Sequence, residues 1–267
     1  SSEDLQILTN LGIDYPFIFT CGSLLPYRNC EIIIQAYAQN IEQQLIADDI
    51  RLVIAGKSDD KAYSKMLAEL ISQTGLKKQI IMLGQVDKTC MQALYRHARL
   101  FVTASETEAC PNIAIEAMAS GCRIVASDSM PMPEIFQQAA CYFKHGDSLS
   151  LAQVMTQNVS HKTPTCKPLA LQRAADFSWP LCAQQTFELL SKYNGKLASI
   201  NGATQIRAGV IRPEIVIPLA ISDSNQDSMT SEESDGMIVG SLVRVIRSPN
   251  FGKIGKVIDL PTELSKM

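Results

Sequence analysis

The sequence predicts an α/β fold in which a parallel sheet carries helices on both faces, with a small β-rich unit at the C-terminal end. Short apolar runs rich in β-branched residues recur through the first two thirds of the chain, and longer amphipathic stretches separate them. Strands that alternate with helices form parallel sheets. The runs are almost continuously apolar, which is typical of strands whose two faces are both covered.

Each element follows from a stretch of this kind. The predicted strands, in chain order, are 17–22 (FIFTCG), 51–56 (RLVIAG), 80–84 (IIMLG), 100–105 (LFVTAS) and 123–127 (RIVAS). Amphipathic stretches predict helices at 29–46, 61–76 and 90–98. Helical sequence continues after residue 147, and residues 177–194 predict a last helix that starts near Pro180.

The character of the chain changes after the α/β region, which we assign to residues 1–196. Residues 197–221 predict a β-rich connector interrupted by prolines. Residues 222–236 hold five acidic residues and no basic residue, which predicts an acidic disordered linker. Residues 237–267 alternate like short strands between glycines at turn positions, which predicts a further β segment.

The composition is that of an ordinary soluble globular protein, with 46% hydrophobic and 19% charged residues. A formal net charge of -3 does not favour nucleic acid or an anionic membrane as a bulk partner. No apolar run approaches the roughly 18 residues that a transmembrane helix needs. The stretch SSEDLQILTN has neither the basic start nor the apolar core of a signal peptide. We therefore expect a cytoplasmic location, at most peripheral to a membrane.

The eight cysteines form no C-x-x-C pair, and several lie inside apolar runs. This pattern indicates buried thiols in a reducing compartment rather than a disulfide framework or a zinc site. Asp-x-Asp is also absent from the sequence. We expect no metal and no bound cofactor.

The stretch 105–121 (SETEACPNIAIEAMASG) predicts a ligand site. Asn112 is a good N-cap for a short helix that Gly121 would end. The loop before this helix lies at the carboxyl edge of the predicted sheet, where open α/β sheets bind ligands. We expect the backbone amides of Ile113 and Ala114 to be free in the first turn and to offer a seat for a phosphate.

Three glutamates accompany this loop. Glu116 is expected in the first helical turn, where its carboxylate could accept hydrogen bonds from a vicinal diol such as a ribose. Glu108 is expected across the phosphate seat, and Glu106 is expected to be solvated. A purely structural interpretation of Glu116 stays open, because the helix dipole stabilises acids near a helix N-terminus by roughly 0.3–1 kcal/mol.

At residues 106–127, ETEACPNIAIEAMASGCRIVAS resembles the E-x7-E segment of retaining, two-lobed (GT-B) glycosyltransferases of family 4. The resemblance covers about residues 15–193. It extends to CGSLLPYRNCEIIIQAY, RLVIAGKSDD, IIMLGQV, LYRHARLFVTAS, RIVASDSMPMPEI and the terminal FSW and FELL. It implies a Rossmann-like, nucleotide-sugar-binding C-terminal lobe of such an enzyme.

The resemblance also implies roles for individual residues. Glu116 would hold the nucleotide ribose, and Glu108 would face the donor sugar in a catalytic position. The amides of Asn112, Ile113 and Ala114 would meet the diphosphate, and the turn 83–86, which ends at Val86, would contact the base. The substrate would be a nucleotide sugar such as a UDP- or GDP-sugar.

The chain departs from the family at its phosphate-binding basic pair. The family places an arginine, and five residues later a lysine, after the first strand, and these positions are Ser23 and Arg28 here. Arg28 can still clamp phosphate, so we assign it a catalytic role, although a solvated residue at a helix start is the alternative. Gly22 and Ser23 would line the same site, and Lys57 after the second strand could replace the missing cation.

A second departure is the absence of the lobe that binds the acceptor. We expect a fragment with little activity alone, whose acceptor, a glycan or a lipid-linked sugar, would bind a missing N-terminal lobe. None of the three histidines is a persuasive catalytic base. His97 is expected to be structural and partly buried, and His145 and His161 are expected to be exposed.

Residues 237–261 (MIVGSLVRVIRSPNFGKIGKVIDLP) resemble a KOW-type, SH3-like β segment. Such a segment implies contact with RNA or a protein, although its charges can equally form the wet face of a strand. We expect it to be cut short at Met267. A non-catalytic interaction module is therefore the alternative function, and a nucleotide-sugar epimerase is a weaker one.

Overall fold

The computed structural model describes residues 2–106, 108, 111–159, 167–196, 198–201, 214–217, 242–244 and 254–256 of the 267-residue chain. The chain divides into two compact units, Ser1–Gln185 and Thr186–Met267. Every residue that the sequence assigns to the nucleotide-sugar site lies in the first unit.

A parallel sheet of six strands forms the centre of the first unit, in the order β3-β2-β1-β4-β5-β6. The strands are β1 (Phe17–Cys21), β2 (Arg51–Ala55), β3 (Ile80–Gly84), β4 (Leu100–Thr103), β5 (Ile124–Ser127) and β6 (Ala140–Phe143). In the middle of the sheet, Ile18 of β1 is paired with Leu52 of β2 and with Leu100 of β4. This order is that of a Rossmann-like sheet, so the predicted fold class is confirmed.

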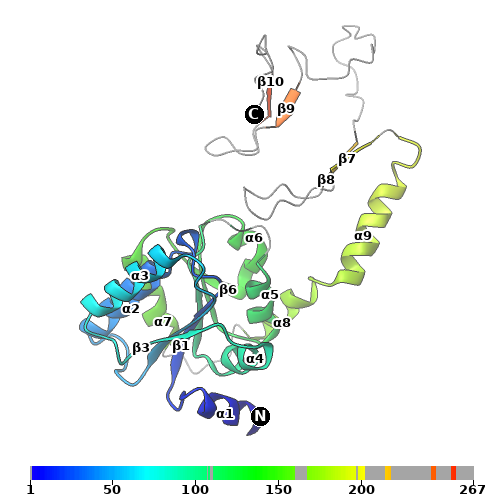
Figure 1. Ribbon diagram of the computed structural model, residues 1–267. Helices are drawn as coiled ribbons and strands as arrows, with labels where there is room; N and C mark the ends of the chain where they lie inside the picture. The colour runs from blue at the N-terminus through cyan, green and yellow to red at the C-terminus, as the bar shows by residue number, and fades with distance from the viewer. Residues whose placement is uncertain are drawn as a thin grey trace. The chain divides into compact units, whose positions relative to one another are not determined.

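Helices cover both faces of this sheet (Figure 1). They are α1 (Ser2–Asn10), η1 (Pro26–Arg28), α2 (Cys30–Glu42), α3 (Lys61–Gln73), α4 (Lys88–His97), α5 (Asn112–Ala119), α6 (Met132–Phe136), η2 (Gln137–Ala139), α7 (Ser148–Val159) and α8 (Lys167–Ala175). A further helix, α9 (Trp179–Ser191), has no buried residue among those described and belongs to neither buried cluster. One buried cluster joins Ile18 to α2, α3 and α7, and the other joins Phe19 to α1, α4, α5, α6 and α8. Neighbouring strand residues point to opposite faces, so two covered faces require the continuous apolar runs seen in the sequence.

The structure differs from the predicted elements in several places. Strand β6 and helix α1 were not predicted. Helix α2 ends at Glu42 rather than residue 46, where Gln44 takes a positive φ of 55°. Helix α3 ends at Gln73, and Gly75 has a φ of 73°. A positive φ is incompatible with a right-handed helix, so both helices stop before it.

Helix α5 ends as the sequence predicts. Gly121 has a φ of 69° and donates its N–H to Met118 O, and Cys122 N donates to Ala117 O. These two bonds form a Schellman motif, which needs a left-handed residue at the position of Gly121. The end of α5 is therefore set by local chemistry.

Beyond the end of α9, the second unit contains two antiparallel strand pairs in its described residues. Strand β7 (Ser199–Asn201) pairs with β8 (Glu214–Val216), and β9 (Leu242–Arg244) pairs with β10 (Ile254–Lys256). The acidic stretch 222–236 lies outside the described residues.

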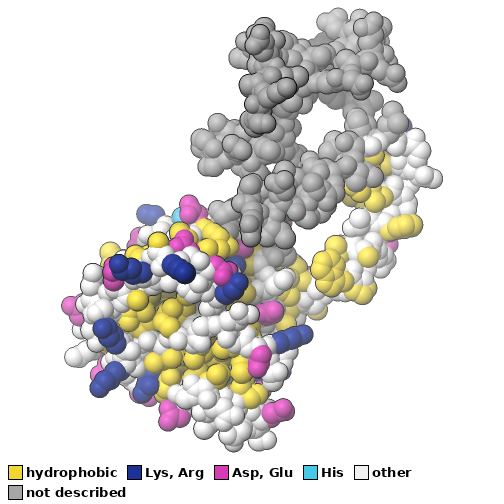
Figure 2. Space-filling model, in the orientation of Figure 1, with side chains coloured by type: hydrophobic (Ala, Val, Ile, Leu, Met, Phe, Trp, Pro, Cys, Tyr) yellow, Lys and Arg dark blue, Asp and Glu magenta, His cyan; other side chains and the backbone are white. Residues whose placement is uncertain are grey.

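The face of the α/β unit seen in Figure 2 carries Lys, Arg, Asp and Glu side chains interspersed with one another. The charges on that face therefore do not form a field of one sign. Among the helices in the described part of the chain, none is both long and apolar enough to cross a membrane.

Candidate functional site

The site lies at the carboxyl ends of β1 and β4, the neighbouring strands at which the strand order of the sheet reverses. Ligands of open α/β sheets bind at such a switch point. Here hydrogen bonds join the loops that follow the two strands. Asn29 Nδ2 donates to Ala104 O at 3.1 Å, and Glu106 N donates to Tyr27 O at 2.8 Å. The two loops therefore form one rim.

The loop after β4 is also held from the side of β5. Ser127 Oγ donates to Ser105 O, and Ser129 Oγ donates to Glu106 O, both at 3.0 Å. The strand-end segment 104–106 is thus fixed from both neighbouring strands. Glu106 itself is exposed, as the sequence predicts.

An ion pair between Arg28 and Glu108 spans this rim. Arg28 Nη1 lies 2.5 Å from Glu108 Oε1 and 3.5 Å from Ser105 Oγ. The two side chains are only 14% and 11% exposed, so Arg28 is not the solvated residue that the alternative interpretation required. Arg28 Nε and Glu108 Oε1 are both buried, and within the described part of the chain neither has a partner at hydrogen-bond distance and angle. The pair is held by charge, and it keeps hydrogen-bonding capacity for a ligand.

Burial also changes the acidity of Glu108. Desolvation raises the pKa of its carboxyl, and the Arg28 charge and the Ser105 hydroxyl only partly oppose this rise. The carboxylate therefore lies in a place that disfavours a lone negative charge.

Glycines at the strand ends bring the backbone of this region close together. Gly22 has a φ of 125°, and a Cβ there would lie 3.3 Å from Arg28 Cζ. A Cβ on Gly56 would lie 1.7 Å from Gly22 O, so no side chain fits at Gly56. Leu24 N donates to Lys57 O at 2.8 Å, which places the loop of Ser23 beside that of Lys57. Ser23 is half-buried, whereas the Lys57 ammonium is exposed and lies 2.9 Å from Asp59 Oδ1.

The first turn of α5 differs from the prediction. The helix starts at Asn112, and its N-cap is Pro111, without a side-chain cap bond, so Asn112 as the N-cap is wrong. Ala114 N donates to Pro111 O at 3.0 Å, so its amide is not free. Among the described residues, the amides of Asn112 and Ile113 have no acceptor and remain for an anion.

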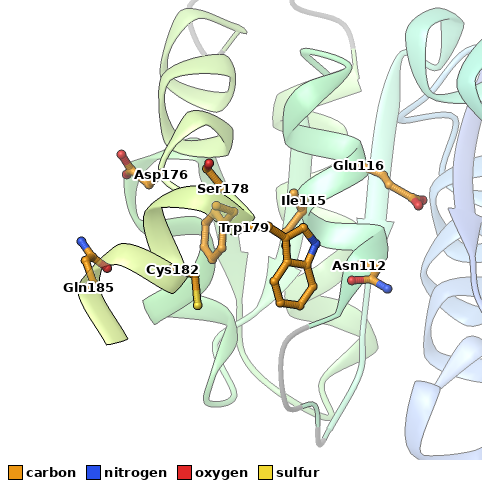
Figure 3. Close-up of a pocket in the computed structure, with 9 residues that line it drawn as sticks. Asn112, Ile115, Glu116, Asp176, Ser178, Trp179, Cys182 and Gln185 are labelled. Carbon is orange, nitrogen blue, oxygen red and sulfur yellow. The ribbon is translucent and has the colours of Figure 1, made fainter. Parts of the chain in front are cut away.

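Glu116 lies one residue further along the helix than predicted, because α5 already begins at Asn112, and no acid lies in its first turn. Its side chain is exposed and points away from the indole of Trp179 (Figure 3). Glu116 Oε2 accepts a hydrogen bond from the hydroxyl of Tyr95 at 3.3 Å. The sequence pattern gave no indication that Tyr95 belongs to the site. In the predicted helix 90–98, only His97 was considered as a candidate residue.

Val86 follows β3 in the turn that Gly84 opens with a φ of 70°. It is half-buried and packs against the cluster around Phe19. Gly56 N donates to Gly84 O at 2.8 Å, so the ends of β2 and β3 are joined directly. Val86 therefore lies at the same carboxyl edge as the other predicted site residues.

A cavity of about 560 Å³ adjoins the start of α5 (Figure 3). It extends between α5 and the residues that connect α8 to α9. Its lining consists of Asn112, Ile115, Glu116, Asp176, Phe177, Ser178, Trp179, Cys182 and Gln185. Phe177 and Trp179 were not predicted to line a site, because nothing in their local sequence indicates that they lie beside α5.

The histidines and cysteines contribute no metal site in the portion of the chain that the structure describes. His97 is 29% exposed and lies 3.4 Å from Asp4 Oδ2, which agrees with a structural role. His145 is half-buried with its Nδ1 buried, so its predicted exposure is wrong, because Asp128 Oδ1 accepts from its backbone N–H and holds it against the loop after β5. His161 lies outside the described residues.

The described cysteines are all free thiols. Cys21, Cys30 and Cys122 are buried, which agrees with the predicted buried thiols, whereas Cys182 is exposed. Cys90 and Cys141 are half-buried, and Cys110 and Cys166 lie outside the described residues.

Known proteins are similar to this chain in sequence. An uncharacterized glycosyltransferase of Methanocaldococcus jannaschii is 29% identical over 154 residues, which are 55% of this chain and 38% of that protein. The D-inositol 3-phosphate glycosyltransferase of Mycobacterium tuberculosis is 22% identical over 218 residues, which are 77% of this chain and 42% of that protein. The chain thus spans less than half the length of these curated relatives.

Two solved structures have a similar fold. Anabaena HepE in complex with UDP and glucose superposes with a TM-score of 0.63 at 24% identity, over 72% of this chain and 53% of that one. The C-terminal domain of a glycosyl transferase group 1 family protein (LpcC) of Francisella tularensis superposes with a TM-score of 0.57 at 23% identity, over 66% of this chain and 93% of that one.

Residues 7–166 match the family described as glycosyl transferases group 1. The match covers more than half of the 267 residues and contains β1 to β6, the Arg28–Glu108 pair and α5. The chain therefore belongs to the group 1 glycosyltransferases.

Proposed function

We propose that this chain is the donor-binding lobe of a retaining, family 4 GT-B glycosyltransferase. The observation that carries the proposal is the Arg28–Glu108 pair, which meets at the switch point of the sheet in the loops that lead to the N-terminus of α5. A cation and a helix N-terminus can bind the diphosphate of a nucleotide sugar, and an acid beside them can face its sugar. The donor is a nucleotide sugar such as a UDP- or GDP-sugar, and HepE, with a similar fold, was solved with UDP and glucose.

The diphosphate would bind Arg28 and the amides of Asn112 and Ile113. A guanidinium offers paired N–H groups that fit phosphate oxygens, and free amides at a helix start favour anions. The Ala114 amide is already bonded, so it contributes through the helix dipole only. Gly22 lets the backbone of β1 approach the same phosphates.

The other site residues would contact the remaining parts of the donor. Glu116 would bind the ribose, Glu108 would face the sugar, and Val86 would contact the base. Ser23 would donate one neutral hydrogen bond where relatives carry a cation. Lys57 would supply the missing charge after its ammonium leaves the exposed contact with Asp59.

The chemistry would come mainly from stabilising the departing diphosphate. The bond between the sugar C1 and the phosphate oxygen breaks, the acceptor hydroxyl oxygen bonds to C1 with net retention, and the hydroxyl proton passes to the departing phosphate oxygen. Arg28 and the α5 amides would bind the negative charge that develops on the leaving group. For this, Arg28 must exchange Glu108 for phosphate, which frees Glu108 to meet the sugar.

The acceptor, a glycan or a lipid-linked sugar, would bind a second lobe that these 267 residues do not include. We therefore expect the chain by itself to bind the donor and to transfer the sugar with little activity.

A non-catalytic interaction module is the second candidate, and the neutral Ser23 favours it. The β9–β10 pair, in which Ile254 lies opposite Arg244, supports a KOW-like hairpin that contacts RNA or a protein. In this case the α/β unit would keep the fold without binding a donor.

Calorimetric titration with UDP, GDP and ADP separates the two candidates. One nucleotide should bind, and Arg28→Ala and Glu116→Ala should each weaken it about ten-fold or more, as the loss of about 1.5–3 kcal/mol for a charged hydrogen bond predicts. Arg51→Ala is the matched control, because Arg51 stacks on Tyr15 at the amino end of β2, far along the strand from the site. Failure of a folded sample to bind any of the three nucleotides would favour the interaction module.

A further inference from the structure

A buried tyrosine contacts the carboxylate that we assign to the ribose. Tyr95 lies on α4, is 1% exposed, and donates its hydroxyl to Glu116 Oε2 at 3.3 Å. We propose that Tyr95 is a positioning residue that holds Glu116 in the orientation that receives the two vicinal hydroxyls of a ribose. This inference rests on the proposed function, because it names a second residue that decides how the same site recognises its ligand.

The ring of Tyr95 is itself held in place by aromatic packing. Phe19 lies edge-on at a centroid distance of 5.3 Å and an angle of 80°, and Phe101 at 5.4 Å and 65°. Both phenylalanines are 0% exposed. Edge-to-face packing is a favourable arrangement of aromatic rings and defines their mutual orientation. The hydroxyl is therefore a fixed point to which the side chain of Glu116 is bonded.

A thiol lies on the other side of this hydroxyl. Cys21 Sγ, at the end of β1, is 3.0 Å from Tyr95 Oη. Burial raises the pKa of Cys21 to about 12, and burial beside Cys21 also raises the pKa of Tyr95. Both groups are thus protonated at neutral pH. A phenol donates one proton and can accept another, so the favourable chain runs from Cys21 to Tyr95 to the Glu116 carboxylate.

The hydroxyl of Tyr95 has a second hydrogen-bond acceptor besides Glu116. Ile113 O lies 3.4 Å away and is an alternative acceptor. A carboxylate is the stronger acceptor, because hydrogen bonds to ionised groups are roughly twice as strong as neutral ones. The contact with Glu116 is therefore the one that the proton of Tyr95 favours.

Glu116 gains from this contact because it is exposed. A free glutamate samples several rotamers and loses that freedom when a ligand binds. An anchor at Oε2 removes part of this cost before the ligand arrives, and the carboxylate keeps Oε1 and further lone pairs for hydroxyl donors. Tyr95 should therefore strengthen binding only of ligands that use those hydroxyls.

The test uses nucleotides that differ only in their ribose hydroxyls. Calorimetry would give the affinities of the wild type and of Tyr95→Phe for UDP, GDP, ADP and their 2′,3′-dideoxy counterparts. The variant should weaken the ribonucleotide that binds by about five-fold or more, and its dideoxy counterpart by less than about two-fold. Tyr37→Phe is the matched control, because Tyr37 is also fully buried and donates to Ile50 O at 2.7 Å; it should leave the ratio unchanged.

The outcomes separate this inference from the proposed function. If the wild type binds none of the six nucleotides, the proposed function and the inference both fail. If the wild type binds a ribonucleotide and Tyr95→Phe weakens both members of the pair equally, or neither, only the role of Tyr95 is overturned. Should thermal melting show that Tyr95→Phe is unfolded, Glu116→Ala takes its place, and an equal loss of affinity for the ribonucleotide and its dideoxy counterpart in that variant overturns the inference.

Discussion

At the scale of single residues, the site depends on charged groups that are buried before any ligand arrives. Arg28 and Glu108 are each less than one sixth exposed and neutralise one another. Breaking a partly buried pair by removing one partner leaves the other charge uncompensated. The pair therefore keeps both side chains at the switch point, ready to exchange partners when a diphosphate binds.

The raised pKa of Glu108 makes a prediction about stability and pH. The pKa of Glu108 is higher in the folded chain than in the unfolded chain, so the folded chain binds the proton more tightly. The free energy of unfolding therefore falls as pH rises through the window between the unfolded-state and the folded-state pKa. Above the window the cost of burying the ionised carboxylate is fully present. Glu108→Gln cannot ionise, so its stability should show a smaller fall with rising pH over this range. Urea unfolding of both proteins between pH 4 and pH 7 measures the difference; parallel curves would contradict the assignment.

A second residue-scale prediction concerns the contact of Gly56 with Gly22. A methyl group on Gly56 would lie 1.7 Å from Gly22 O, so Gly56→Ala must displace the backbone under Arg28. We expect a loss of about 3 kcal/mol or more in the free energy of unfolding, and weaker nucleotide binding. Gly75→Ala is the control: it has a positive φ of 73° but open space, and should cost only about 1 kcal/mol. Equal losses in the two variants would show that steric contact is not the cause.

At the scale of secondary-structure elements, α5 and α9 shape the two sides of the candidate region. Helix α5 presents its amide end to the switch point, and its other end is closed by the Schellman motif at Gly121. Helix α9 has no buried residue among those described, and its Trp179 is 88% exposed beside the cavity. The first helix is positioned by the core, whereas the second offers an apolar surface.

Helix α3 supplies an element-scale prediction away from the site. Asp60 is its N-cap, and Asp60 Oδ1 accepts from Tyr63 N at 2.9 Å. Asp60→Ala should lower the free energy of unfolding by about 1 kcal/mol, and Asp60→Asn by less, because asparagine also caps well. Thermal melting and nucleotide titration would check both variants. A change in nucleotide affinity would show that α3 is coupled to the site, which the proposed geometry does not predict.

At the scale of the whole molecule, the α/β unit contains both buried clusters and every proposed donor contact. Units with their own cores can fold separately. The chain spans less than half the length of the curated relatives named above.

Removal of residues 197–267 tests this division. The shortened chain still contains all of α9, and we expect its affinity for the bound nucleotide to stay within about two-fold of the full chain. Thermal melting should show the same transition for the α/β unit in both proteins. A large loss of affinity would mean that the C-terminal residues take part in donor binding.

Much of this organisation could be predicted from local sequence. Continuous apolar runs identified β1 to β5, and every residue of β1, β4 and β5 is buried, as strands covered on both faces require. Gly121 marked the end of α5 for a similarly local reason. Strand β6 was not predicted, because its short run ACYF contains no β-branched residue.

The sequence by itself therefore determined the fold class and the membership of the group 1 glycosyltransferases, and it singled out two separate stretches, one with Arg28 and one with Glu108 and Glu116. Only the tertiary structure decided which of these residues meet. Arg28 pairs with Glu108, 80 positions away, because β1 and β4 are neighbours in the sheet although β2 and β3 separate them in the chain. Tyr95 reaches Glu116 from another helix, because α4 and α5 pack into the same buried cluster. Strand order arises from long-range packing of the two core clusters, and no local pattern encodes it.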